Sequence, residues 1–461
     1  MFRKMSTLGF AGLLGACSVV GPDFHRPNID LPQSFAFASG SGGLEVAARH
    51  MWWSGFEDPL LEGIVARAMA QNINLAIARL RIEESRALLG TAGRNAQLSG
   101  SVSARVEGRQ TGRTDWAYDK SVTFQPSFLV DLFGGEKRAK EALLADVDAA
   151  AFEAAAARIA LQLEVVSTYI ELRYSEAAIR ERRRSIDIKL RTAGAVKARV
   201  DLGEATRVDL RRSQAEIATL RAQIPNLETG RELAVLRLAT LLAEPAAKIG
   251  RELAGAGQGQ PKPPGQTDPG VPADLVRIRP DVRAAEAAFA SAVAEIGVRE
   301  AQLYPSLQLT GTLTASTTNA FQMGPVLSFP VLDRGLRKAR LEAAQIAAKR
   351  TESAWRQSII EAVEDVQIAL VRYQKSTRRE QELGRAVALY RDTFVLTEEA
   401  FKLGTLTVDD VLSTEDSASS VRLQRVDARL ERALAWAQLN AALGLGWMPT
   451  PAHEPELASG E

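Results

Sequence analysis

Residues 136–201 read EKRAKEALLADVDAAAFEAAAARIALQLEVVSTYIELRYSEAAIRERRRSIDIKLRTAGAVKARVD, without proline and with one glycine, Gly194. Apolar residues recur in this stretch at spacings of 4, 3 and 4, at Ile159, Leu163, Val166 and Ile170. This spacing is typical of a helix that packs lengthwise against other helices. Unbroken, such a helix would be roughly 100 Å long at about 1.5 Å per residue.

The pattern is repeated in the second half of the chain. The same apolar spacing returns at Ile359, Val363, Val366 and Leu370. Each long stretch ends at a leucine-glycine pair, Leu202-Gly203 in the first half and Leu403-Gly404 in the second, and a further helical stretch follows each pair. Matched order and spacing in two halves predict an internal duplication built from two long helical hairpins, at 136–243 and 336–444.

A two-residue period precedes each long helix. Val102, Ala104 and Val106 alternate with serines and Arg105, and after a polar loop Val122, Phe124 and Phe128 alternate with polar residues. The second half repeats this with leucines and threonines. The alternation predicts strand pairs at about 98–130 and about 306–330, each with one apolar and one polar face.

These patterns divide the chain into six segments. We expect a signal peptide at 1–16, an extended arm at 17–51, a first repeat at 52–246, a proline- and glycine-rich linker at 247–279, a second repeat at 280–447 and a tail at 448–461. The fold class expected is mainly helical with a small β part.

Composition excludes several classes of function. Lysine and arginine number 57 against 56 aspartate and glutamate, so no excess charge points to a nucleic-acid partner. The arginines around Arg183 alternate with acidic residues, which is typical of a solvated helix face. With one cysteine and three scattered histidines, the sequence offers neither a disulfide nor a metal cluster. No nucleophile–base pair or carboxylate dyad indicates an enzyme, and no cofactor is expected.

The N-terminus has the features of an export signal. Arg3 and Lys4 precede a short apolar run, and small residues lead up to Cys17. The run is too short for a transmembrane helix. Leu14-Gly15-Ala16-Cys17 resembles a bacterial lipobox, which implies that Cys17 is lipidated; an ordinary signal peptide with an incidental cysteine is the alternative.

The strands constrain the architecture further. Two-faced strands suit either a soluble sandwich or an outer-membrane barrel, and the export signal favours the membrane. Four strands cannot close a barrel, because single-chain barrels begin at about eight. Unpaired strand edges in lipid cost several kcal/mol per backbone group. If the strands lie in a membrane, the chain must therefore oligomerise.

Several short motifs, in this order, resemble those of one family. They are the lipobox followed by Gly21-Pro22-Asp23-Phe24, Trp52-Trp53 with Phe56, Val130-Asp131-Leu132-Phe133-Gly134-Gly135, Tyr304-Pro305-Ser306, Leu332-Asp333-Arg334-Gly335, and Gly404 with Val408-Asp409-Asp410-Val411-Leu412. Together they resemble the TolC-like outer-membrane efflux proteins, in the lipoprotein branch of the OprM and NodT type. Gln97-Leu98-Ser99 stands where the second repeat has Tyr304-Pro305-Ser306, which is a departure from that pattern.

The resemblance implies a homotrimer with a shared twelve-stranded barrel in the outer membrane and a helical tunnel in the periplasm. It implies a periplasmic adaptor and an inner-membrane pump, of the RND type, as partners. The channel would be a passive, lipid-anchored exit duct for small molecules. An exit channel for type I protein secretion and a periplasmic coiled-coil scaffold are the alternatives.

The resemblance also implies where the functional residues lie. The helix turns would be periplasmic tips that dock the adaptor, with Leu202, Gly203, Leu403 and Gly404 at their centre. Asp409 and Asp410 would narrow the closed entrance by charge repulsion, and Leu412 would add an apolar constriction. The alternative for the two aspartates is favourable placement at a helix N-terminus. Arg207 and Asp209 are candidate latch partners.

Overall fold

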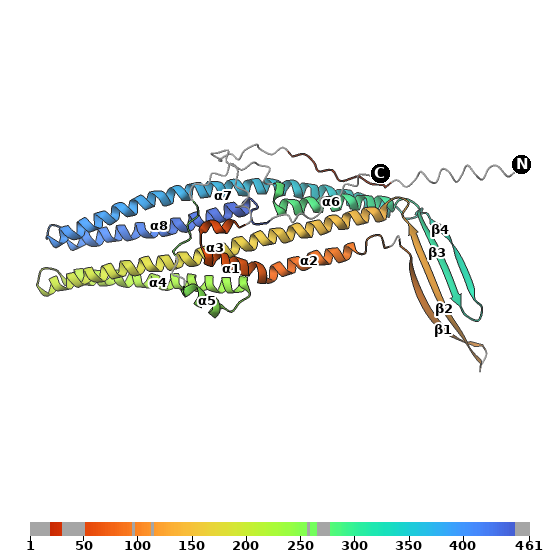
Figure 1. Cartoon of the computed structure of the whole chain (residues 1–461), viewed down its shortest axis with the longest axis horizontal. Coiled ribbons are helices and arrows are strands. Elements are labelled where there is room, and N and C mark those ends of the chain that lie inside the picture. The colour runs from red at the N-terminus through yellow and green to blue at the C-terminus, as the bar shows by residue number, and fades with distance from the viewer. Residues whose placement is uncertain are drawn as a thin grey trace. The chain divides into compact units, whose positions relative to one another are not determined.

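A computed structural model of the chain describes residues 19–29, 51–94, 97–111, 115–255, 259–264 and 277–447 (Figure 1). Cys17, most of the predicted arm and the predicted tail lie outside these residues. The chain divides into two compact units. The first comprises residues 1–30, 78–154 and 280–360, and the second comprises 31–77, 155–279 and 361–461.

The first unit contains a four-stranded antiparallel sheet in the order β1-β2-β3-β4. The strands are β1 (Ser99–Thr111), β2 (Asp115–Val130), β3 (Ser306–Ala315) and β4 (Ala320–Ser328). Among the described residues, β1 and β4 each pair on one side only. Helix α6 (Pro280–Ala301) belongs to the same unit, with parts of α2 (Ile73–Leu89) and of the two long helices.

The register gives this sheet one apolar face. Val102 pairs with Phe124, Phe124 with Leu313, and Leu313 with Phe321, so that a single apolar row crosses all four strands. The members of this row are exposed: Val102 by 69% and Phe321 by 69%. The neighbouring row is polar, with Ser103 opposite Thr123 and the Thr123 hydroxyl 3.3 Å from that of Thr314.

The first strand pair is longer than the second. Pairing of β2 with β3 ends at Val122 and Ala315, whereas pairing of β1 with β2 continues to Thr111 and Asp115. Trp116 and Tyr118 lie on this extension, with stacked rings 6.4 Å apart. Both side chains are more than half exposed. Aromatic residues are typical of the interface between a membrane and water.

The second unit consists of helices. It contains η2 (Trp52–Phe56), α1 (Pro59–Gln71), α4 (Arg207–Leu242), α5 (Ala246–Gly255) and α8 (Val408–Ala442). It also contains most of the two long helices, α3 (Gly135–Asp201) and α7 (Leu336–Lys402). Each long helix has 67 residues and, with α4 or α8, forms a hairpin (Figure 1). Of the eight seam residues predicted from the repeat, six are buried, and Leu163 and Val363 are partly buried.

A buried polar cluster joins the start of the second unit to α3. Asp58 accepts hydrogen bonds from the amides of Leu60 and Leu61, which caps α1, and from the Tyr169 hydroxyl at 2.6 Å. Arg173, only 1% exposed, donates to Tyr169 and to Glu176. Burial raises the pKa of Tyr169, which therefore stays protonated and remains a donor.

The predicted linker at 247–279 is wrong in its first part, because residues 246–255 form helix α5. Ile249 and Leu253 are four positions apart, are 1% and 3% exposed, and belong to a helix that contacts α4. Arg67 of α1 holds this helix through both oxygens of Glu252. A ten-residue helix has too few turns to give a periodic signal, and its stability comes from this packing.

Candidate functional site

The two helix turns have the same backbone geometry. Gly203 and Gly404 have φ angles of +78° and +76°, in the left-handed region that glycine occupies without strain. The amide after each glycine donates back to the helix, Glu204 to Arg199 at 2.8 Å and Thr405 to Ala400 at 3.0 Å. This is a Schellman-type helix end.

Apolar side chains are exposed at both turns. Leu202 is 74% and Leu403 is 80% exposed, and Val208, in the first turn of α4, is 73% exposed. A Cβ added at Gly203 or Gly404 would meet no atom within 4 Å. These residues therefore form open surfaces that a partner can reach.

Asp209 and Asp410 are capping residues. Thr206 and Asp209 form a capping box at the start of α4, and Thr407 and Asp410 form one at the start of α8. Hydrogen bonds from the Thr407 hydroxyl and amide lower the pKa of Asp410, so that it stays ionised. The structure thus gives Asp410 the helix-terminal role that was the alternative in the sequence analysis.

The cross-hairpin ion pair at the turns differs from the one predicted. Asp409 pairs with Arg212 at 3.3 Å, and both side chains are more than 60% exposed. Asp209 is bound to Thr206 within its own turn, and Arg207 has no ion pair among the described residues. The sequence shows Arg207 and Arg212 on the same helix but does not indicate which of them faces α8.

Leu412 does not line an exposed surface of the chain. It is 6% exposed and its neighbour Val411 is 4% exposed, since both lie on the buried face of α8. Because its side chain is buried, Leu412 does not form the predicted apolar constriction in the part of the chain that the structure describes. The residue serves packing within the protomer.

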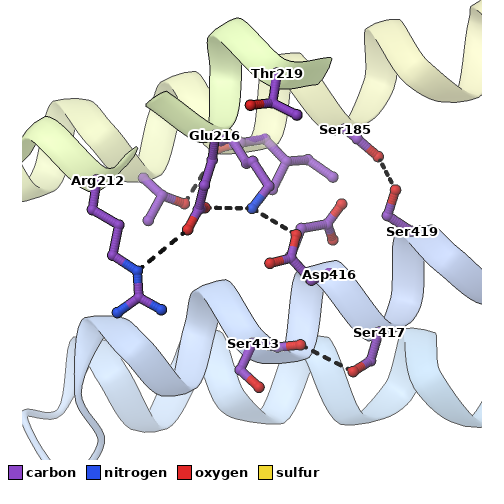
Figure 2. A network of polar contacts seen from close by, with 12 residues as sticks. Ser185, Arg212, Glu216, Thr219, Ser413, Asp416, Ser417 and Ser419 are labelled. Carbon is purple, nitrogen blue, oxygen red and sulfur yellow. Dashed lines mark hydrogen bonds and ion pairs between the residues drawn. The ribbon is translucent and has the colours of Figure 1, made fainter. Parts of the chain in front are cut away.

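A polar network extends from the turns into the helices, and it was missed by the sequence analysis. The ammonium group of Lys189 on α3 lies 2.8 Å from Glu216 on α4 and 2.6 Å from Asp416 on α8. Glu216 also contacts Arg212, at 3.5 Å, which connects the network to Asp409. Figure 2 shows Arg212, Glu216 and Asp416 gathered between the first hairpin and α8.

Lys189 is the centre of this network. Its side chain is 3% exposed. Burial alone would lower the pKa of Lys189, but the hydrogen bonds of Asp416 and Glu216 outweigh burial and raise the pKa. A sequence signal existed, because Lys189 falls between the buried Ile186 and Ala193, on the apolar seam of α3. A charge on a buried seam needs a partner.

A second polar group lies further along α8. Arg422 contacts Glu181 at 3.2 Å and Glu415 at 2.7 Å, and the hydroxyls of Ser185 and Ser419 are 2.5 Å apart (Figure 2). Glu415 is 1% exposed, and its burial raises its pKa although Arg422 opposes the shift. The two groups connect α8 to the first hairpin through charged and polar contacts.

The described part of the N-terminal arm is fixed within the first unit. The Val20 amide donates to the carbonyl of Phe133, two residues before α3, and Arg138 donates to the carbonyls of Val20 and Gly21 and to Asp23. Arg138 is 6% exposed. A Cβ at Gly21 would come within 2.4 Å of the Gly297 backbone, so the arm packs closely here.

Two features are absent from the part of the chain that the structure describes. None of the helices described combines the length and the hydropathy needed to cross a membrane. Within the same residues, no group of three or more histidine, cysteine, aspartate or glutamate side chains is placed to hold a metal ion.

The chain belongs to the outer membrane efflux protein family, whose model matches residues 64–244 and 271–445. Nodulation protein T of Rhizobium leguminosarum bv. trifolii is 30% identical over 97% of this chain and 98% of its own. Outer membrane protein OprJ of Pseudomonas aeruginosa is 28% identical over 96% of each chain. The solved structure of the outer-membrane channel OprN superposes with a TM-score of 0.83 at 26% identity, over 93% of this chain and 100% of that one.

These similarities confirm the predicted fold class and the predicted function. The protein is an outer-membrane channel component that serves as the exit duct of an efflux system.

Proposed function

We propose that three copies of this chain assemble into one channel, with their sheets joined into a twelve-stranded barrel. The observation that carries this proposal is the open four-stranded sheet, which has one apolar face and whose outer edges on β1 and β4 are unpaired within the described residues. In lipid, unpaired edge groups cost several kcal/mol each, and pairing with the next copy removes that cost. The apolar rows then face lipid, and the rows containing Ser103, Thr123 and Thr314 face the lumen.

The helix turns form the periplasmic entrance of this channel. The exposed Leu202 and Leu403, beside Gly203 and Gly404, make an apolar surface that fits a periplasmic adaptor. The adaptor couples the channel to an inner-membrane pump of the RND type. The channel itself has no catalytic activity, and the pump supplies the energy for export of small molecules.

Cys17 is the site of lipid attachment. One residue, Ser18, separates Cys17 from Val19, the first residue of the arm that the structure describes. Val19 lies against Gly134, between β2 and α3, and Arg138 holds the residues that follow. Lipid on Cys17 would therefore be attached two positions before a part of the arm that packs against the residues following β2.

The proposed assembly is tested with Cys17→Ala and wild-type protein from the same cells. We expect both to remain in the membrane after a high-salt wash and to require detergent for release, since the barrel alone retains them. Both should run as trimers in chromatography with light-scattering detection and should conduct ions in planar bilayers. A Cys17→Ala protein that washes off as a monomer would contradict the barrel, whereas loss of lipid alone would not.

The roles of the two neighbouring aspartates of α8 can be distinguished by substituting each one separately. Asp409→Asn removes the ion pair with Arg212, so we expect the closed-state conductance in bilayers to rise by at least about twofold. Asp410→Asn weakens the capping box, so we expect a lower melting temperature and an unchanged conductance. Equal conductance changes in both variants would show that the ion pair is not part of the gate.

A further inference from the structure

The second unit contains a cavity of about 230 Å³ that has no role in the export function proposed above. Its lining is formed by Pro261, Lys262 and Pro263, by Glu380 of α7, and by Arg425, Arg429 and Arg432 of α8. The three arginines are four and three positions apart and therefore share one face of α8. Four positive side chains surround one carboxylate, which leaves a net charge of +3 on the cavity lining.

The arginines use only part of their hydrogen-bonding capacity. Arg425 and Arg429 each donate Nε–H to the same oxygen of Glu380, at 3.3 Å, and Arg432 donates Nη1–H to the other oxygen at 3.4 Å. The terminal nitrogens of Arg425 and Arg429 have no partner among the described residues. The Nε of Arg432 is buried and also lacks one there.

Free guanidinium forks are suited to a particular class of ligand. The two terminal N–H groups of an arginine match two oxygens of a phosphate or carboxylate, and such paired bonds are stronger than neutral hydrogen bonds. The side chains of Arg425 and Arg429 are 32% exposed and that of Arg432 is 16% exposed, so an anion here would be only partly screened by water.

The surrounding residues keep the arginines in place. The guanidinium of Arg425 lies over Gly384 of α7, where an added Cβ would stand 3.3 Å from Nη2. Arg432 donates to the Pro264 carbonyl at 3.2 Å, and Gln260 donates to the Val426 carbonyl at 2.8 Å. The nearby Glu431 is paired with Arg379 and does not line the cavity.

We propose that this cavity binds a small, multiply charged oxyanion carrying phosphate or carboxylate groups. Its oxygens bridge the terminal nitrogens of Arg425 and Arg429, and Lys262 contributes a further positive charge. The bound anion connects residues 259–264, which lie between the two repeats, with the α7–α8 hairpin. The site does not include the residues of the helix turns.

The test is calorimetric titration of the full-length protein in non-ionic detergent, with pyrophosphate and with citrate, at constant ionic strength. We expect saturable binding of one anion per chain. A preference for pyrophosphate would assign the natural ligand to phosphate compounds, and a preference for citrate to carboxylates. If neither pyrophosphate nor citrate binds saturably, the proposal is overturned.

Variants separate the effects of charge and geometry. Arg425→Gln and Arg429→Gln should each weaken binding at least about tenfold. Arg429→Lys should weaken it less, since it keeps the charge but loses the fork. Gly384→Val, which displaces the Arg425 guanidinium without changing the charge, should also weaken binding. Arg385→Gln, an exposed arginine of α7 paired with Glu382, is the control and should bind like wild type.

Folding of each variant is checked by its melting temperature and far-UV circular dichroism without ligand. Binding that persists unchanged in the double variant Arg425→Gln, Arg429→Gln, in folded protein, would place the anion elsewhere and overturn the assignment of this site.

Discussion

Replacing Lys189 with methionine should open the channel at rest. Lys189 is a buried cation of α3 that contacts carboxylates on both α4 and α8, through Glu216 and Asp416. Methionine fills a similar volume in the apolar seam but removes the cation that lies between the two carboxylates. Their repulsion favours separation of α8 from the first hairpin.

The size of this effect follows from the contacts that are lost. Charge-assisted hydrogen bonds contribute about 1.5–3 kcal/mol each, and the partial exposure of Glu216 and Asp416 reduces this to about 1–2 kcal/mol for the network in each protomer. Since about 1.4 kcal/mol corresponds to a factor of ten, we expect roughly a tenfold shift toward the open state. The measurement is resting conductance in planar bilayers, with uptake of a large antibiotic by intact cells as a second readout.

A matched control is available on the same helix. Lys197→Met removes an exposed lysine of α3 that has no ion pair among the described residues, and it should leave conductance unchanged. The pH dependence is a further check. Because the pKa of Lys189 is raised in the folded protein, its contribution is complete below the unfolded value of about 10.4 and is lost only in more alkaline solution. Resting conductance of Lys189→Met equal to that of Lys197→Met would exclude the network from gating.

Replacing Arg422 with methionine should lower the free energy of unfolding more than any of the other substitutions proposed for this protein. Glu415 is 1% exposed and Arg422 is the cation that contacts it, at 2.7 Å. Without Arg422 the buried Glu415 carboxylate loses its ion-pair partner, which costs about 3 kcal/mol or more. Thermal unfolding of the detergent-solubilised protein, followed by circular dichroism, measures this loss.

The pH dependence of stability identifies the cause of the loss in Arg422→Met. Burial raises the pKa of Glu415 above its unfolded value of about 4.3, so the folded state binds a proton more readily than the unfolded state does. The favourable contribution of protonated Glu415 is fully present below the unfolded pKa and is lost as the pH rises through the folded pKa. Arg422→Met raises that pKa further. The variant should therefore regain stability between pH 7 and pH 5 more steeply than wild type.

Two further variants test this explanation. Glu415→Gln combined with Arg422→Met should recover most of the lost stability at pH 7, because the buried charge is gone. Arg183→Met removes an exposed arginine that pairs with Glu228, and it should change the free energy of unfolding by no more than about 0.5 kcal/mol. A double variant as unstable as Arg422→Met would point to lost packing of the arginine stem instead.

The predictions from the sequence agree best with the structure where a periodic pattern extends over many residues. The two 67-residue helices and the four strands extend over enough residues for their periods to be read directly. The glycines at 203 and 404 end their helices because both have positive φ. Helix α5 was missed because ten residues carry little periodicity, and its buried face exists only against α4.

The functional site was predicted less completely. The sequence located the turns and their exposed leucines, since a helix end is a local property of the chain. It gave Asp209 and Asp410 as gate candidates, with a helix-terminal role as the alternative for Asp410, and the structure shows both residues in capping boxes. It missed Arg212, Lys189 and Arg422, because their partners come from other helices.

By itself the sequence therefore determined the duplication, the two-faced strands and the positions of the turns, since each depends on residues close together in the chain. Tertiary structure alone decided which charges meet: Lys189 with Glu216 and Asp416, Arg212 with Asp409, and the three arginines with Glu380. The physical reason is that a helical period fixes which residues share a face, while the rotation and axial register of the packed helices select the residues that face them.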